Sequence, residues 1–220
     1  MVIVVTGGIG SGKSEVCRII GEKYGLPLYN ADAKVKEIYV RYPSVVEELE
    51  RQLECPLRDG DGAFIPKLLA DRIFGDHIAV EIVEKLIFPY LSDDFDAFLK
   101  ESAMPVVFES ATVLEKDAFN GFGDVVVLVD APMDVRMARA CARDASDMEK
   151  VRARMDSQKF MNFVSEGCTG ASEEYKAILD RIDHMIINTG TFHDLEIKVQ
   201  EVMDKILSNT KQVNNNKLHK

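Results

Sequence analysis

The sequence has no long uncharged segment and no basic leader, and each absence narrows the class of protein. Its longest stretch without Asp, Glu, Lys or Arg is the first twelve residues, whereas a membrane-spanning helix needs roughly 20 mostly apolar residues. No basic segment precedes the N-terminal apolar run, so we expect no secretory signal. The sequence therefore predicts a protein that does not interact with a membrane.

Paired cysteine motifs are also missing. The four cysteines lie far apart and form no CxxC pair, which argues against a zinc site or a redox motif. We expect Cys17, Cys55, Cys141 and Cys168 to be free thiols, the usual state in a reducing compartment. The predicted location is therefore the cytoplasm.

An excess of basic charge is missing as well. Among 220 residues, 27 are Lys or Arg and 37 are Asp or Glu, so the formal net charge is −10. Such a surface repels phosphate backbones, which argues against nucleic-acid binding, and an anionic ligand needs a local basic pocket. Apolar residues make up 46% and charged residues 29%, which is typical of a soluble globular protein.

Five short apolar runs alternate with helix-competent segments: residues 2–5, 26–29, 105–108, 125–129 and 185–187. This alternation predicts an α/β fold with a five-stranded parallel sheet and helices on both faces. Pro27 suggests that the second strand lies at an edge. We expect helices over residues 13–25 and 31–53, with a break at Pro43, and from Pro66 to about residue 101, with an interruption at Pro89.

Polar residues follow the apolar runs and would meet at one edge of the sheet, where ligands bind in such folds. Phosphoryl transfer to a hydroxyl group needs a carboxylate that orients or deprotonates it. Asp32 and Glu109 are the candidates for such a role. Asp130 precedes Ala131 and Pro132, so a helix cap or a turn is its better interpretation.

Residues 7–14, GGIGSGKS, fit the pattern GxxxxGK[ST] between the first strand and the first helix. Glycines let the backbone turn its N–H groups toward phosphate oxygens, and the following helix adds its positive dipole end. Lys13 can reach the β- and γ-phosphates, and the Ser14 hydroxyl can ligate Mg²⁺. A GTPase switch is disfavoured, because the only Asn-Lys pair lies in the C-terminal tail and does not continue as NKxD.

Arg136, Arg139 and Arg143 have the spacing of one helix face. Residues 136–154 contain six basic and three acidic side chains, a net charge of +3 within a chain of −10. One interpretation is a solvated helix face with local ion pairs. Because the stripe follows a strand in a phosphate-binding chain, we interpret it as the start of a closing lid whose guanidinium groups bind phosphate.

An ordered set of segments resembles the dephospho-coenzyme A kinase family. The segments are residues 6–14, 30–38 (NADAKVKEI), 61–76, 125–144, 153–158 (ARMDSQ) and 186–190 (IINTG). The resemblance implies a P-loop kinase-like three-layer fold, with ATP and Mg²⁺ as cofactors. It also implies transfer of the ATP γ-phosphate to the 3′-hydroxyl of dephospho-coenzyme A, the last step of coenzyme A synthesis.

The resemblance and the glycine loop together assign roles to individual residues. The expected catalytic residues are Lys13, Asp32, Glu109 and Arg139, the lid residues are Arg154 and Gln158, and the metal ligand is Ser14. The expected ATP-binding residues are Gly8, Ile9, Gly10, Ser11, Gly12, Lys13, Ser14, Glu15, Arg143, Asn188 and Gly190.

The expected organisation is a single P-loop kinase domain over residues 1–208, as a monomer or weak homo-oligomer, followed by a polar tail over residues 209–220. Its core comprises residues 1–30, 103–143 and 182–208, with a helical substrate-binding region over 31–102 and a lid over about 144–181. Asn30, Phe88 and Glu109 depart from the family's pattern at the acceptor end. Another small P-loop kinase for a nucleotide or metabolite, or a catalytically weak nucleotide-binding regulator, therefore stays open as an alternative.

Overall fold

The computed structural model describes residues 1–116, 119–144, 147–158 and 173–218. Much of the predicted lid, and Cys168, lie outside these ranges. The chain divides into two compact units, one of Met1–Tyr29 with Ala103–Lys220 and one of Asn30–Ser102. Cys17, Cys55 and Cys141 are free thiols, as predicted. Among the described residues, no helix combines the length and apolar composition needed to cross a bilayer.

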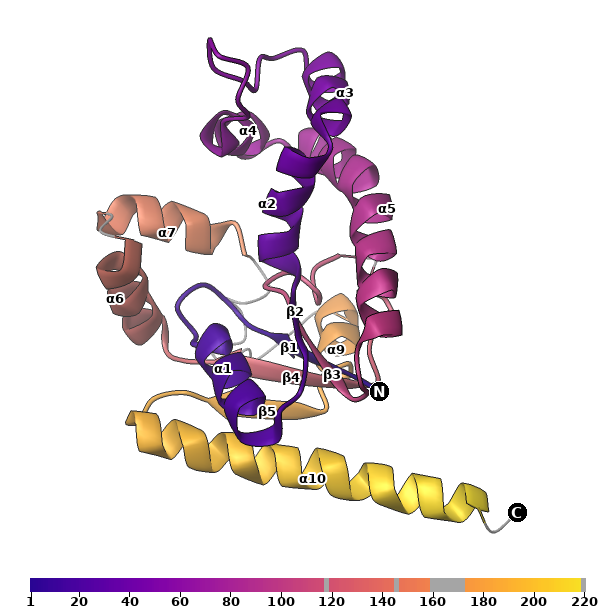
Figure 1. Ribbon diagram of the computed structural model, residues 1–220. Coiled ribbons are helices and arrows are strands. Elements are labelled where there is room, and N and C mark those ends of the chain that lie inside the picture. The colour runs from indigo at the N-terminus through magenta and orange to yellow at the C-terminus, as the bar shows by residue number, and fades with distance from the viewer. Residues whose placement is uncertain (117–118, 145–146, 159–172, 219–220) are drawn as a thin grey trace. The chain divides into compact units, whose positions relative to one another are not determined.

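A parallel sheet forms the centre of the first unit (Figure 1). Its strands are β1 (Val2–Thr6), β2 (Leu28–Asn30), β3 (Val106–Glu109), β4 (Val125–Asp130) and β5 (His184–Ile187). Their order is β2-β3-β1-β4-β5, and β1 pairs in parallel with β3 and β4. The predicted five-stranded sheet and the edge position of the strand after Pro27 are therefore confirmed.

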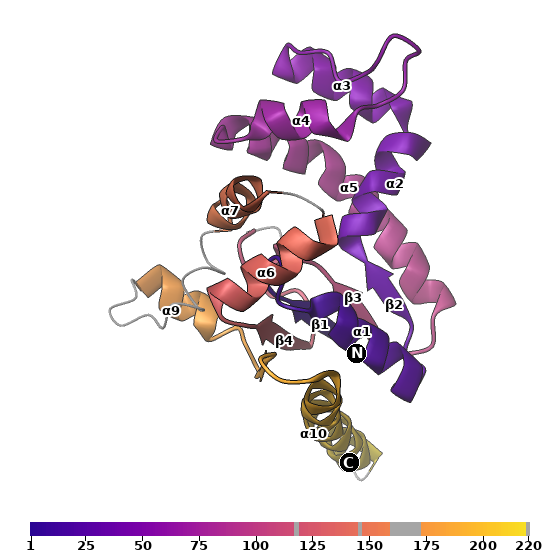
Figure 2. The same cartoon turned by 90° about the vertical axis from the view of Figure 1, so that its left-hand side faces the viewer.

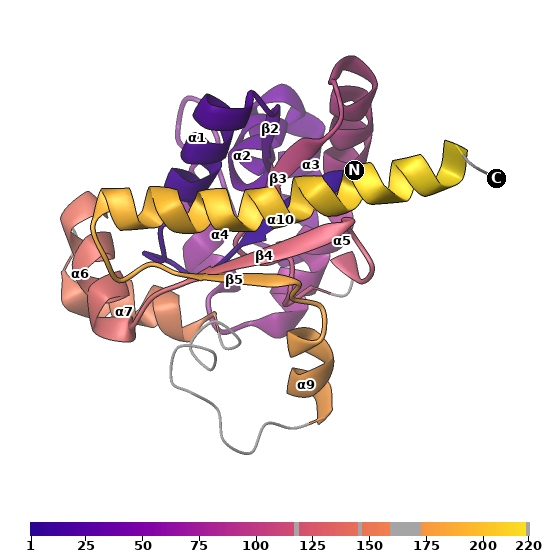
Figure 3. The same ribbon diagram turned by 90° about the horizontal axis from the view of Figure 1, so that it is seen from below.

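Helices cover both faces of this sheet. On one face, α1 (Lys13–Tyr24) and α10 (Phe192–Leu218) pack Val16, Ile20 and Val199 against Ile3 and Val5 of β1. Figure 3 shows α10 running back along β4 and β5. The helix α9 (Glu173–Leu179) lies on the opposite side of the sheet from α10 (Figures 1 and 2). The central strand is thus buried in a core that anchors the loop leaving its carboxyl end.

Two further helices of the first unit follow β4: α6 (Met133–Asp144) and α7 (Met148–Asp156). Met137 and Ala140 of α6 pack with Val151 and Met155 of α7, and Ile9 of the glycine loop packs against this cluster. The helix pair therefore contacts the loop through an apolar side chain as well as through polar groups.

The second unit consists of helices α2 (Ala31–Arg41), α3 (Pro43–Leu53), α4 (Pro66–Ile73) and α5 (His77–Glu101). Its apolar interior includes Leu49 of α3 and Leu91 of α5. Helices α3 and α4 begin at Pro43 and Pro66, which confirms the predicted break and the predicted helix start. Proline fits the first turn of a helix without the loss of a hydrogen bond.

Two expected boundaries are wrong. The helix α5 continues through Pro89, although an internal proline removes a hydrogen bond and crowds the preceding turn. Buried Ile87 and Leu91 flank the proline, and Tyr90 packs its ring 4.8 Å from that of Tyr42, so packing holds both halves in place. The backbone of α10 also continues to Leu218, into the segment expected to be a tail, because no glycine or proline ends the helix after residue 190.

Candidate active site

The loop between β1 and α1 has a backbone that only glycine adopts easily. Gly10 and Gly12 have φ angles of +77° and +97°. The Ser11 N–H donates to the Gly8 carbonyl at 3.1 Å, which closes the turn. Gly12 is the N-cap of α1 and has no side chain to cap the first N–H groups of the helix. The loop and the helix start therefore provide N–H donors and a positive dipole end for an anion.

The Ser14 hydroxyl and the Glu109 carboxylate meet beside this loop. The Ser14 Oγ donates to Glu109 Oε1 at 2.7 Å. Glu109 is buried at the end of β3, where it pairs in register with Val5 of β1. Burial raises the pKa of the neighbouring Cys17 thiol well above its ordinary value, Glu109 raises it further, and Lys13 opposes the shift. The structure thus brings Lys13, Ser14 and Glu109 together, as the sequence predicted.

Within the described part of the chain, two buried hydroxyl groups at the loop lack hydrogen-bond partners. Among the described residues, the Thr6 and Ser11 hydroxyls accept and donate no hydrogen bond. A buried polar group without a partner is unfavourable, and such groups are typical of sites that a ligand or water completes. Thr6 was not among the expected site residues, although its hydroxyl group directly before the glycine loop could have indicated a role in the site.

Arg136 does not belong to an open phosphate-binding stripe, which corrects the sequence interpretation. Its side chain is fully buried, and its Nε donates to the Ile9 carbonyl at 3.0 Å. The guanidinium group also lies 3.9 Å from the Asp130 carboxylate. Burial lowers the pKa of Arg136, and the Asp130 charge opposes that shift. The residue spacing correctly predicted a helix, but only the packing of α6 against the loop decides that Arg136 faces inward.

Asn188 links the glycine loop to the end of β4. Its Nδ2 donates to the Ser11 carbonyl at 2.9 Å, and its backbone N–H donates to the Asp130 carbonyl at 2.7 Å. Arg139 donates to the Asn188 backbone carbonyl at 3.1 Å. Gly190 is exposed just before α10. The predicted site residues Ser11, Arg139 and Asn188 are thus in direct contact.

The lid residues Gln158 and Arg154 and the expected ATP-binding residue Arg143 make two kinds of contact. Gln158 is buried two residues beyond the end of α7, and its Oε1 accepts the Ile9 N–H at 2.8 Å. Arg143 and Arg154 both donate to Asp144 at 2.6 Å. These two hydrogen bonds, that of Arg143 first, hold the pKa of Asp144 well below its usual range. Asp144 was not among the expected site residues, although its position directly after Arg143 was a signal for it.

Asp32 lies in the second unit, in the first turn of α2, and is exposed. The N-cap of this helix is Asn30, whose Oδ1 accepts the Ala33 N–H at 2.8 Å. The capping role is therefore filled by Asn30, and the Asp32 carboxylate is open to solvent.

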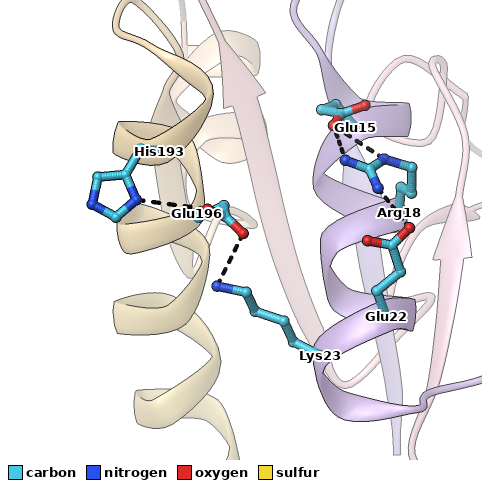
Figure 4. A network of polar contacts seen from close by, with 6 residues as sticks. All are labelled: Glu15, Arg18, Glu22, Lys23, His193 and Glu196. Atoms are coloured by element: carbon cyan, nitrogen blue, oxygen red, sulfur yellow. Dashed lines mark hydrogen bonds and ion pairs between the residues drawn. The ribbon is translucent and has the colours of Figure 1, made fainter.

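Glu15 extends along the outer face of α1 in a network of ion pairs (Figure 4). It accepts from Arg18 at 2.6 Å, and Arg18 also contacts Glu22. On the neighbouring helix, Glu196 of α10 contacts Lys23 at 3.2 Å. The contacts of Glu15 thus lie within α1, and the separate pair of Lys23 and Glu196 joins α1 to α10.

The strained loop backbone leads to a stability prediction. Gly10→Ala should lower the free energy of unfolding by about 1–3 kcal/mol, because an alanine Cβ would meet the Arg136 carbonyl and φ is positive. Gly21→Ala is the matched control: its site in α1 is open, so we expect stabilisation by roughly 0.5–1 kcal/mol. Denaturant unfolding measures both, and equal effects of the two variants would contradict the loop geometry.

Comparisons with known proteins identify the family. A TT1252 crystal structure from Thermus thermophilus has a TM-score of 0.73 and 25% identity, over 93% of this chain and 97% of that one. A dephospho-CoA kinase of Porphyromonas gingivalis is 36% identical over 157 residues, 71% of this chain and 77% of that protein. One from Chlorobaculum tepidum is 29% identical over 94% of this chain and 96% of its own length. The dephospho-CoA kinase family model matches residues 1–162, and the chain belongs to this family.

Proposed function

We propose that this protein transfers the γ-phosphoryl group of ATP to the 3′-hydroxyl of dephospho-coenzyme A, giving coenzyme A and ADP. Membership of a kinase family supports the reaction class. The observation that carries the proposal is the phosphate-binding loop with a carboxylate and a hydroxyl beside it, Glu109 and Ser14, joined at 2.7 Å. A loop of this kind holds the transferred group, and little covalent chemistry is left for the protein to do.

Ser14 and Glu109 are the residues that would hold Mg²⁺. Both offer the hard oxygen atoms that Mg²⁺ prefers, and it commonly takes only one or two protein oxygens besides water and substrate phosphates. Accordingly, the described residues contain no cluster of three or more His, Cys, Asp or Glu side chains arranged for a metal. When bound, Mg²⁺ neutralises charge on the β- and γ-phosphates.

Lys13, the expected ATP-binding residue Arg143 and the lid residue Arg154 supply the remaining positive charge. Lys13 begins α1, so its ammonium group would reach the phosphates that the loop N–H groups bind. Arg143 and Arg154 share Asp144, and phosphate oxygens would compete with that carboxylate for their guanidinium groups. Arg139 contacts Asn188 and would support the loop at its nucleotide side.

Asp32 is the proposed base for the acceptor hydroxyl. Its carboxylate is exposed and is not the cap of α2, so it is available to accept a proton. The second unit, Asn30–Ser102, would carry the acceptor, with Asp32 near its first residue. We also infer a cytoplasmic enzyme, because the described cysteines are free thiols.

A coupled assay of ADP release tests the proposal. The purified protein is given ATP, Mg²⁺ and one acceptor at a time: dephospho-coenzyme A, nucleosides, nucleotides or small hydroxylated metabolites. We expect release only with dephospho-coenzyme A, and mass spectrometry with nuclease digestion should locate the new phosphate at the 3′-position. Transfer to another acceptor would favour the alternative kinase, and ATP binding without any transfer would favour a regulator.

The metal assignment predicts the behaviour of Glu109→Gln. Glu109 also accepts the Ser14 hydroxyl and so orients the second expected ligand. Loss of such a partner lowers metal affinity about 10–100-fold, so half-maximal activity should need correspondingly more Mg²⁺. Glu22→Gln is the control, because Glu22 lies on the outer face of α1 and contacts Arg18. Single-turnover transfer at a series of Mg²⁺ concentrations measures the effect. If the two variants had the same Mg²⁺ dependence, Glu109 would not take part in metal binding.

A further inference from the structure

One residue of the glycine loop, Ile9, is held in three ways by α6, α7 and the segment that directly follows α7. Arg136 donates to its carbonyl at 3.0 Å, and Gln158 accepts from its N–H at 2.8 Å. Its side chain packs against the apolar cluster around Met137 and Met155. Both backbone polar groups of Ile9 are thus engaged within the protein, in contrast to the expectation that Ile9 binds ATP, and the residue acts as the attachment point of the loop.

The Arg136 contact is the unexpected one, because burying a guanidinium group is costly unless polar partners satisfy it. An apolar side chain of similar length would fill the same space. Among its contacts, the guanidinium donates to the Ile9 carbonyl and lies 3.9 Å from the Asp130 carboxylate, which is beyond hydrogen-bond distance. An apolar side chain could not make the hydrogen bond to the Ile9 carbonyl, so this bond is one reason for an arginine at this position.

Holding the Ile9 carbonyl also determines the direction of the next N–H group. In a trans peptide the carbonyl and the following N–H point in opposite directions, so the Gly10 N–H is aimed away from Arg136. Gly10 has φ of +77°, and glycine allows the Ile9–Gly10 peptide to rotate at little steric cost. A loop without this hydrogen bond would therefore sample both orientations of that peptide.

We propose that Arg136 is a positioning residue of the phosphate loop, which fixes the Ile9–Gly10 peptide so that the loop N–H groups are preorganised for phosphate. The inference rests on the proposed function only in that the loop binds ATP. A loop that is ordered before binding loses less conformational entropy when the nucleotide arrives. Arg136 then acts on nucleotide affinity through the backbone, without touching the nucleotide.

Three replacements separate the possible roles of Arg136. Arg136→Met keeps the length and the apolar contacts but removes the donor. Arg136→Gln keeps a neutral donor, and Arg136→Lys keeps the charge opposite Asp130. Arg152→Met is the control, because Arg152 is exposed on α7 and contacts Asp156 at 3.8 Å.

Binding of a fluorescent ATP analogue is measured for each variant, with hydrogen–deuterium exchange and thermal unfolding. For Arg136→Met we expect an about tenfold higher Kd, the factor for losing one hydrogen bond from a charged donor. Exchange should rise in residues 7–12 but not in α10, and Arg136→Gln should restore affinity. A purely structural role would raise exchange throughout the first unit.

Unchanged affinity of a folded Arg136→Met protein would overturn the proposal. So would rescue by lysine but not by glutamine, since the ion pair with Asp130 would then be what matters. If Arg136→Met does not fold, the comparison of glutamine with lysine decides in the same way. Because analogue binding needs no acceptor, normal ATP binding without transfer would contradict the proposed function and leave this inference intact.

Discussion

Lys13→Ala is expected to lower turnover roughly 10²–10³-fold, the usual loss when one preorganised donor to a developing negative charge is removed. Lys13 lies at the start of α1, where its ammonium group would contact the β- and γ-phosphates of ATP. Its side chain is not part of the apolar core, so the free energy of unfolding should change little. Initial rates of ADP production and circular dichroism measure the two quantities.

Lys23→Ala is the matched control on the same helix. Lys23 lies near the C-terminal end of α1 and contacts Glu196 of α10 (Figure 4). A surface ion pair of this kind contributes about 0–1 kcal/mol, so this variant should keep its turnover. If Lys13→Ala turned over substrate as fast as Lys23→Ala, the glycine loop would not be the phosphate site.

Asp32→Asn is expected to lower the rate of transfer about 10²–10⁴-fold, which is the typical contribution of a general base. Asparagine has nearly the same shape but cannot take the proton of the acceptor hydroxyl. Because Asn30 caps α2, the substitution should leave the helix start intact. Single-turnover transfer to dephospho-coenzyme A, with ATP and acceptor both saturating, isolates the chemical step from binding.

Asp204→Asn supplies the comparison for this prediction. Asp204 is exposed on α10, within the first unit, and has no assigned role in the reaction. It should retain the rate of the unchanged protein. An Asp32→Asn enzyme with an undiminished single-turnover rate would show that another group accepts the proton, and Glu109 would be the next candidate.

The strands and the glycine loop could be predicted because their signals are local. A short β-branched run followed by GxxxxGK[ST] specifies a buried strand, a tight turn and a helix start within fourteen residues. The structure confirms that succession in β1, the loop and α1. The helix through Pro89 could not be predicted, because the contacts that outweigh the lost hydrogen bond come from residues far away in the sequence, such as Tyr42.

The candidate site divides in the same way. The residue types near Gly12 already indicated phosphate binding. Ser14 follows β1 and Glu109 ends the adjacent parallel strand β3, so both lie at the same edge of the sheet and can make contact. The sequence could not show which arginines of one helix face are buried and which are exposed. Arg136 is buried against Ile9, whereas Arg143 is exposed and paired with Asp144, because packing between elements is not encoded in helix periodicity.

The sequence by itself determined the α/β class, the phosphate loop and the resemblance to a kinase family, since each depends on residues that are neighbours along the chain or occur in a fixed order. Only the tertiary structure decided which polar groups support the loop. Asn188, Gln158 and Arg136 reach it from segments separated from it by more than a hundred residues. Long-range contacts of this kind depend on how the helices pack against the sheet, and the local sequence pattern does not specify that packing.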